Sequence, residues 1–127
     1  MPTVVLLEDD PALRLMLKRM LVRFFDCTVS EASDGAEGLQ LVRDLHPDLV
    51  FLDVHLPTMS GVEVLEAMRA SDATRDIACI AITSENQRPV IERLVAGHVL
   101  DILLKPVVLT RDVPRLEKVF ARLALAP

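Results

Sequence analysis

Five short apolar segments, each followed by a stretch with helical spacing of its apolar residues, limit what this chain can fold into. We predict strands over residues 3–8, 27–32, 48–53, 77–83 and 99–104. Their nearly continuous apolar character is typical of a parallel sheet with both faces covered. Right-handed crossovers lay helices on each side of such a sheet. The sequence therefore predicts an α/β fold, a doubly wound five-stranded parallel sheet with five helices.

Prolines and one capping residue bound the predicted helices. Asp10-Pro11 supplies an N-cap followed by proline at the first helical position. The second helix stops before Pro47, and Pro89 makes the fourth helix begin late. Pro114 is tolerable only in the first turn of the last helix. The apolar positions expected along the five helices are Leu13, Leu17, Met20, Leu21, Phe24; Ala36, Leu39, Val42, Leu45; Val62, Leu65, Met68; Val90, Ile91, Leu94, Val95; and Val113, Leu116, Val119, Phe120, Leu123.

Size and charge exclude several classes of protein. We assign residues 1–127 to one domain, because this length is close to the commonest domain size. A net charge of −5 and four phenylalanines as the only aromatic residues argue against direct nucleic-acid binding. No apolar run could cross a bilayer and no signal peptide is evident, so we expect a cytoplasmic protein without a membrane partner. Cys27 and Cys79 are expected to be buried free thiols.

Charged and hydroxyl side chains lie at the ends of four predicted strands. The carboxyl ends of parallel strands open on one edge of the sheet, where open α/β sheets bind their ligands. Taken singly, the acids could form a solvated turn and the lysine could be a surface residue. Together, the side chains at this edge point to a site. They are Glu8 and Asp9 after the first strand, Asp53 at the end of the third, Thr83 at the end of the fourth and Lys105 after the fifth.

Three acids gathered at one edge favour a divalent metal, since without a cation they would repel one another. Carboxylate oxygens suit Mg²⁺, or the similar Mn²⁺, which often pairs with one or two carboxylates and a phosphate. Such an ion also withdraws charge from an incoming phosphoryl group. Asp53 is therefore a candidate for covalent aspartyl-phosphate chemistry, with Lys105 and Thr83 able to contact phosphoryl oxygens.

These residues resemble the receiver domains of two-component response regulators, over essentially the whole chain. Each match alone is weak, but all of them occur in order and at strand ends. The matching residues are the acidic pair Glu8-Asp9, the phospho-acceptor Asp53, the switch hydroxyl Thr83, the Lys105-Pro106 pair, and Leu56-Pro57, Met59 and Gly61 after the acceptor. The resemblance implies a flavodoxin-like sheet of strand order 2-1-3-4-5.

The resemblance also implies a ligand set and partners. Mg²⁺ would be bound by Asp9, Asp53 and the backbone carbonyl of His55, with Glu8 acting mainly through water. The Lys105-Pro106 bond would be cis. The phosphoryl donor would be a phosphohistidine on a sensor histidine kinase or on a histidine phosphotransfer protein. The chain would act on a further protein partner and would catalyse only its own phosphorylation and slow dephosphorylation.

Three other positions bear on the speed of dephosphorylation and on output. By resemblance, His55 and Glu85 lie over the phosphoryl site and tune the access of water; the alternative is that they are ordinary exposed polar residues. The family commonly carries Tyr or Phe three residues before the lysine, where this chain has Ile102. An aliphatic side chain cannot make the inward ring rotation of that aromatic residue. We therefore expect an altered relay through the loops near Pro89 and an extended connection over residues 107–112.

Two other functions compete with a phosphorylation switch. One is an unphosphorylated pseudo-receiver that acts as an adaptor, although its acidic residues and lysine would then have no chemical role. The other is an aspartate-nucleophile phosphatase. That class usually needs a second acid two residues after the nucleophile, and this chain has His55 there.

Overall fold

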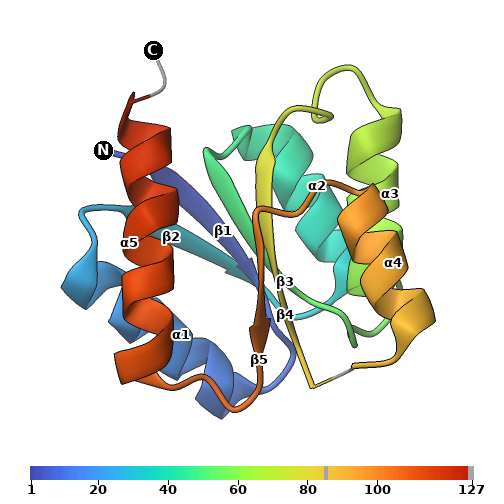
Figure 1. Cartoon of the computed structure of the whole chain (residues 1–127). Helices are drawn as coiled ribbons and strands as arrows, with labels where there is room; N and C mark the ends of the chain where they lie inside the picture. Colours follow the sequence, from blue (N-terminus) through green and yellow to red (C-terminus); the bar gives the residue numbers. More distant parts are fainter. Residues whose placement is uncertain (85, 126–127) are drawn as a thin grey trace.

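The structure of the chain, a computed structural model, describes residues 1–84 and 86–125, in which strands and helices alternate (Figure 1). The strands are β1 (Thr3–Leu7), β2 (Thr28–Ala32), β3 (Leu49–Asp53), β4 (Ala78–Thr83) and β5 (Asp101–Leu104). The helices are α1 (Pro11–Phe24), α2 (Gly35–Leu45), α3 (Gly61–Ala70), α4 (Arg88–Ala96) and α5 (Leu109–Leu125). All pairings are parallel and the sheet order is β2-β1-β3-β4-β5, which confirms the predicted fold and strand order.

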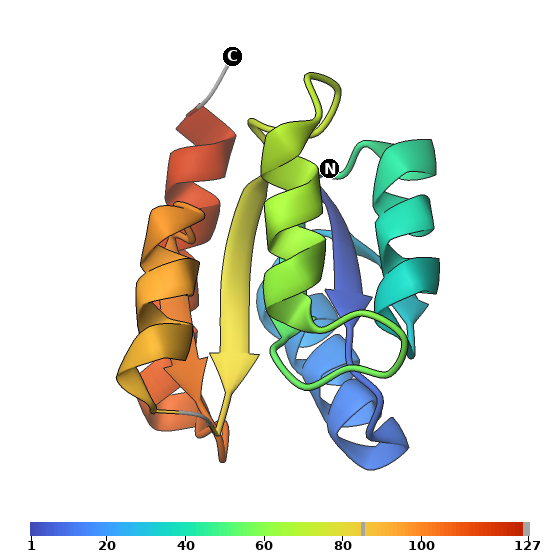
Figure 2. The ribbon, with the colours of Figure 1, turned by 90° about the vertical axis from the view of Figure 1, so that its right-hand side faces the viewer.

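The sheet is the middle of three layers. Helices α1 and α5 cover one face, and α2, α3 and α4 cover the other (Figures 1 and 2). Alternate residues of β1 serve the two cores, because successive side chains of a strand point to opposite faces. Val4 and Leu6 pack beneath α1 and α5, while Val5 and Leu7 pack beneath the other three helices. This double burial explains why the strands are almost continuously apolar.

Local signals set the starts of α1 and α3, and the first of these was expected. The Asp10 carboxylate accepts hydrogen bonds from the backbone N–H groups of Ala12 and Leu13, and Pro11 opens α1. Ser60 and Glu63 form a capping box that starts α3. The predicted strand boundaries agree with the structure to within two residues.

Four of the predicted apolar helix positions are exposed instead. They are Phe24, Ala36, Leu45 and Val95. Phe24 and Leu45 are the last residues of α1 and α2. The next residue, Phe25, enters the core in place of Phe24, because its ring stacks on Phe120 with ring centroids 4.2 Å apart.

The extended connection expected over residues 107–112 is wrong for residues 109–112, which are helical. Helix α5 begins at Leu109, and Pro114 lies inside the helix rather than in its first turn. The physical reason is the carboxylate of Asp112, which accepts the backbone N–H of Val108 at 2.8 Å and so satisfies a donor just before the helix.

The described residues bear on two expectations, about membrane-spanning helices and about the cysteines. None of their helices combines the length and the apolar character that crossing a membrane requires. Cys27 and Cys79 are buried and unbridged, as expected.

Gly61 is required by a close approach of two backbones. A Cβ added there would lie 2.1 Å from the carbonyl oxygen of Asp53, and the Gly61 N–H donates to the carbonyl of Val54 at 2.8 Å. We expect Gly61→Ala to lower the free energy of unfolding by about 2 kcal/mol, because backbone rather than a flexible side chain must move. Alanine is the better helix former, so propensity predicts the opposite sign. Urea unfolding checks this, and an unchanged midpoint would contradict it.

Candidate functional site

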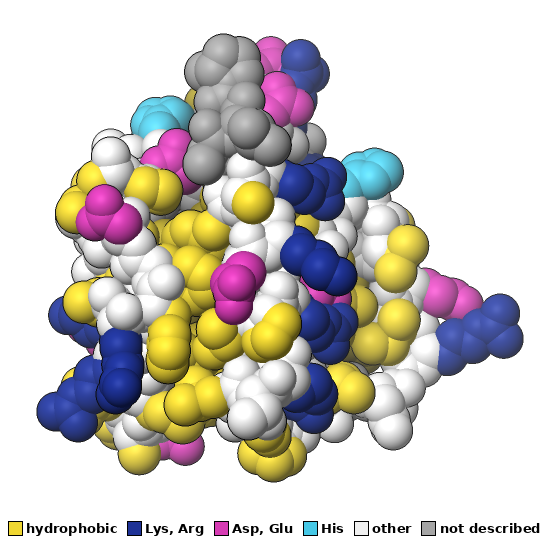
Figure 3. Space-filling model, turned by 60° about the vertical axis from the view of Figure 1, so that its left-hand side comes forward, with side chains coloured by type: hydrophobic (Ala, Val, Ile, Leu, Met, Phe, Trp, Pro, Cys, Tyr) yellow, Lys and Arg dark blue, Asp and Glu magenta, His cyan; other side chains and the backbone are white. Residues whose placement is uncertain are grey.

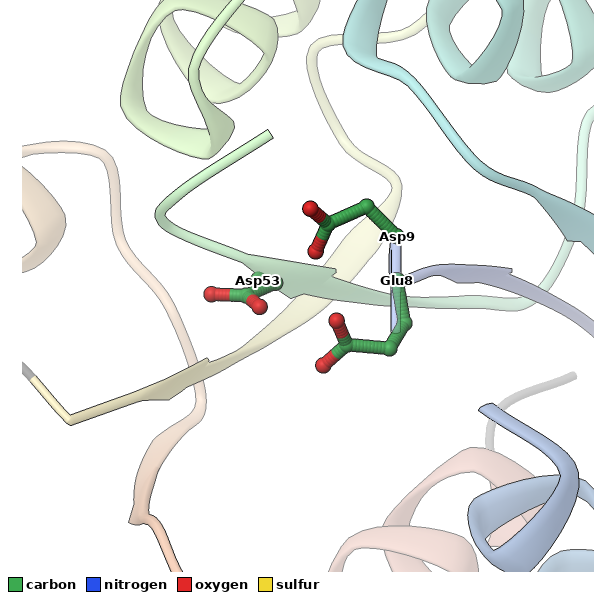
Figure 4. A group of neighbouring side chains, drawn as sticks. All are labelled: Glu8, Asp9 and Asp53. Carbon is green, nitrogen blue, oxygen red and sulfur yellow. The ribbon is translucent and has the colours of Figure 1, made fainter. Parts of the chain in front are cut away.

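The polar residues predicted to meet at the carboxyl edge of the sheet do meet there. Glu8 and Asp9 directly follow β1, Asp53 ends β3, Thr83 ends β4 and Lys105 follows β5. Glu8, Asp53 and Thr83 are buried, whereas Asp9 is exposed. The carboxylates of Glu8, Asp9 and Asp53 lie beside one another (Figure 4).

The three acids form a cluster that can hold a metal ion. Each offers one carboxylate oxygen, and these oxygens lie within 4.8 Å of one another. Oε1 of Glu8 is buried; it lies 3.1 Å from the Lys105 ammonium as an ion pair, but it accepts no hydrogen bond of ordinary geometry from the residues that the structure describes. A carboxylate oxygen in this position has room for a further cation or donor. The donor set therefore fits a hard, oxygen-binding ion such as Mg²⁺.

Lys105 supplies the positive charge among these acids. Its Nζ lies 2.5 Å from Oδ2 of Asp53, and it also forms an ion pair with Oε1 of Glu8 at 3.1 Å. Burial disfavours the charged lysine, but the carboxylates of Asp53 and Glu8 outweigh that effect and raise the pKa of Lys105. The ammonium group therefore stays charged against Asp53 at neutral pH.

Glu8 is the acid whose ionisation the site perturbs most clearly. Burial, followed by the nearby charge of Asp53, raises the pKa of Glu8 to about 7. The backbone N–H of Asp10, which donates to Oε2 of Glu8 at 3.1 Å, and the ammonium of Lys105 oppose this shift. Near neutral pH, the protonated and the ionised forms of the Glu8 carboxyl group are therefore both populated.

Two donors orient the carboxylate of Asp53. The backbone N–H of His55 donates to Oδ1 at 3.0 Å, while Lys105 holds Oδ2. The His55 residue itself is exposed beside the site. One oxygen of Asp53 is therefore held by the main chain and the other by a side chain.

The loop between β3 and α3 is anchored to the start of α2. The hydroxyl of Thr58, a residue with a left-handed φ of 66°, donates to Oδ1 of Asp34 and accepts the N–H of Ala36, each at 3.0 Å. The N–H of Gly35 donates to the carbonyl of Pro57 at 3.0 Å. These bonds hold the segment that carries the His55 backbone.

The loop after β5 is held against β4. The N–H of Lys105 donates to the carbonyl of Thr83 at 2.9 Å, so the two predicted site residues are neighbours through their main chains. The Lys105-Pro106 peptide bond is cis, which confirms the prediction.

Of the two remaining predicted positions, the structure describes Ile102 but not Glu85. Glu85 lies outside the described residues. Ile102 is half-buried and packs against the core beneath α2, α3 and α4. Its part in output stays a prediction.

Arg111 and Asp112 are not singled out by the sequence pattern, which predicts an extended connection over residues 107–112. Asp112 is fully buried and lies in the first turn of α5. An acidic residue near a helix start is a known capping signal. Here the signal was hidden, because the apolar spacing by itself suggested that the helix began later.

An aspartate beside two further acids and a lysine, at the carboxyl edge of a doubly wound sheet, forms a site suited to phosphoryl chemistry with a divalent ion. Residues 4–116 match the response regulator receiver domain, and the chain belongs to this family. It is therefore a receiver domain of two-component signalling, a switch whose acidic cluster can hold magnesium.

Similar proteins agree with this assignment. The chain is 32% identical over 116 residues to a probable C4-dicarboxylate response regulator DctR of Bacillus subtilis, covering 91% of this chain and 50% of that protein. It is 32% identical over 115 residues to the polar-differentiation response regulator DivK of Brucella anthropi, covering 91% and 90%. The chain thus spans about half the length of the DctR regulators and most of DivK.

A solved structure supports the fold. The receiver domain of the sensor histidine kinase PA1611 from Pseudomonas aeruginosa, described with a magnesium ion in its active-site cleft, superposes with a TM-score of 0.81. The two chains are 22% identical, and the match covers 95% of each.

Proposed function

We propose that Asp53 accepts the phosphoryl group. Receiver domains are phosphorylated by histidine kinases, and the donor here would be a phosphohistidine of a sensor kinase or a phosphotransfer protein. One observation carries the proposal: the Lys105 ammonium lies 2.5 Å from Asp53, inside a cluster with the carboxylates of Glu8 and Asp9. A structural ion pair would not need two further acids at the same point.

The transfer is a displacement at phosphorus. A carboxylate oxygen of Asp53 attacks the phosphorus atom, the phosphorus–nitrogen bond of the phosphohistidine breaks, and the imidazole leaves with the electron pair. The product is an acyl phosphate on Asp53, which water later hydrolyses back to the carboxylate and phosphate.

The acids would bind Mg²⁺ or Mn²⁺ through Asp9, Asp53 and the carbonyl of His55, with Glu8 acting through water. When bound, the ion neutralises charge between the acids and the phosphoryl oxygens. Lys105 presents a positive charge to the same oxygens.

The buried Thr83 would act as the switch hydroxyl and bond a phosphoryl oxygen. The added charge would draw Lys105 and Thr83 towards the phosphoryl group, and this local change biases the fold between two states. His55 and Glu85 would set how readily water reaches the acyl phosphate. We expect His55→Ala to change the lifetime of the acyl phosphate.

Incubation with acetyl phosphate and Mg²⁺ tests the proposal. Mass spectrometry should show one phosphoryl adduct, absent in Asp53→Asn, with a lifetime of minutes. No adduct on the folded wild-type chain would instead favour the adaptor. Rapid turnover of small phosphoesters would favour the phosphatase.

An apolar groove beside the site suits the protein that carries the phosphohistidine. One hollow of about 460 Å³ lies along α1 and reaches Leu109; a second of about 400 Å³ is lined by Lys105 and Pro106, and Met16 lines both. Figure 3, which views the molecule from the side of α1 and α5, shows hydrophobic side chains gathered on this face with Lys and Arg beside them. Helix α1 carries four basic residues and no acid, so a helix with apolar and acidic side chains would complement it.

Met16→Glu should separate protein-mediated from chemical phosphorylation. We expect transfer from a radiolabelled phosphohistidine donor to slow by about tenfold, because a charge enters the contact surface. The rate with acetyl phosphate should stay unchanged. Val95→Glu on α4, another exposed apolar position, is the matched control. Equal transfer rates in the two variants would contradict this docking surface.

A further inference from the structure

Asp112 is a buried carboxylate that the proposed chemistry does not use. It is fully buried, and it is held on several sides. Its Oδ2 accepts the N–H of Val108 and Nη2 of Arg111, each at 2.8 Å, and its Oδ1 accepts Nε of Arg111 at 2.9 Å. Burial favours the neutral acid, but these donors outweigh it and lower the pKa of Asp112, so the carboxylate is charged at neutral pH.

The arginine that pairs with Asp112 also forms hydrogen bonds to the loop that carries Lys105. Nη2 of Arg111 donates to the carbonyl of Leu104 at 2.8 Å and to the carbonyl of Pro106 at 3.0 Å. These carbonyls belong to the residues on either side of Lys105. One guanidinium group therefore spans the main chain of the lysine that contacts Asp53.

Lys105 is thus held at its main chain from two directions. Its N–H donates to the carbonyl of Thr83 on β4, and Arg111 binds the flanking carbonyls from the side of α5. A lysine ammonium sits on a flexible four-carbon stem, so a fixed backbone limits where the charge can lie. Small misplacements of a charged group at a reacting centre cost large factors in rate.

We propose that Arg111, oriented by the buried carboxylate of Asp112, is a positioning residue that places Lys105 against Asp53 for phosphoryl transfer. The inference rests on the proposed function, since Lys105 must act on the phosphoryl group for its position to matter. Among the residues that the structure describes, Arg111 binds Asp112 and the carbonyls of Leu104 and Pro106, so it acts on Lys105 through the loop between β5 and α5.

Arginine substitutions on α5 supply the test. We expect Arg111→Met to slow phosphorylation of Asp53 by acetyl phosphate by about tenfold, while Arg115→Met changes the rate by less than about twofold. Arg115 is a matched control, because it too pairs with an aspartate, Asp101, but contacts β5 before the lysine. A rate for Arg111→Met within about twofold of wild type would overturn the proposal.

A second variant covers the case in which Arg111→Met does not fold. Arg111→Lys keeps a cation beside Asp112, but an ammonium group cannot reproduce the planar fork that reaches two carbonyls and a carboxylate. We expect phosphorylation to slow at least about threefold in this variant. A wild-type rate in Arg111→Lys would also overturn the proposal.

A double-mutant cycle distinguishes positioning from a merely structural role. In the Lys105→Met background, adding Arg111→Met should change the residual rate by less than about twofold, because the group it positions is gone. An equal loss in both backgrounds would overturn the proposal.

The NMR signal of the Lys105 ammonium reports its position without any phosphorylation. It should shift in Arg111→Met and stay in place in Arg115→Met. If acetyl phosphate does not phosphorylate the wild-type chain, the proposed function is wrong. If the Lys105 ammonium signal does not shift in Arg111→Met, the positioning by Arg111 is wrong.

Discussion

Lys105→Met is expected to slow phosphorylation of Asp53 by acetyl phosphate at least ~100-fold, the scale of losing one preorganised charge that stabilises a transition state. The ammonium lies 2.5 Å from the attacking carboxylate, in a buried site where its charge is poorly screened. Methionine keeps an unbranched apolar stem and removes the charge. Mg²⁺ binding should persist, because all three acids remain.

The comparison is with Lys18→Met. Lys18, on the surface of α1, forms its ion pair with Glu31 at 3.1 Å and not with the acids of the cluster. Its loss should leave the rate of phosphorylation unchanged. A rate for Lys105→Met close to that of Lys18→Met would show that Lys105 only balances charge in the resting protein.

Glu8 should make the metal-free protein less stable as the pH rises. Burial and the neighbouring Asp53 raise the pKa of Glu8 to about 7, against an ordinary value of 4.5. Below the ordinary value both the folded and unfolded states carry the proton, so Glu8 has no effect on stability. Between the two values only the folded state holds the proton, and stability falls with rising pH. Above a pH of about 7, Glu8 is ionised in both states, and the folded state bears the full free-energy cost of the buried charge.

The size of that loss is up to about 3 kcal/mol, since each unit of pKa difference corresponds to about 1.4 kcal/mol. Asp112 does not compete in this window: its pKa is lowered, so its contribution is lost only as the pH falls through the acidic range below the ordinary value of 3.8. Urea unfolding at pH 5 to 8, with and without Mg²⁺, measures the effect.

Glu8→Gln should flatten this pH dependence and raise the stability of the metal-free protein at pH 8. The amide keeps the shape of the side chain without its negative charge. Glu117→Gln, at an exposed position of α5, is the control and should retain the wild-type slope. Saturating Mg²⁺ should raise the unfolding midpoint of the wild-type chain more at pH 8 than at pH 5, because protons compete with the metal. The same slope in Glu8→Gln and wild type would contradict this account.

The fold and the main site were predictable because their signals are local. Asp53 at the end of an apolar strand and Lys105-Pro106 after another are visible as short motifs, and parallel topology then brings their strand ends to one edge. The cap at Asp10 and the buried thiols follow from local sequence in the same way.

The misplaced details depend on contacts between segments that the pattern does not connect. Phe25 rather than Phe24 enters the core because Phe120 of α5 lies opposite it. Helix α5 starts at Leu109 because the Asp112 carboxylate folds back to Val108. No apolar periodicity could report either contact.

The sequence by itself determined the class of fold and singled out Glu8-Asp9, Asp53 and Lys105, because each of these is a short local pattern at the end of an apolar strand. Only the tertiary structure decided how the lysine is held. Arg111 reaches the carbonyls of Leu104 and Pro106 only when α5 packs beside β5, and its orientation depends on the burial of Asp112. The physical reason is that every residue has a main-chain carbonyl, so the identity of a residue does not show whether its carbonyl accepts a hydrogen bond from Arg111.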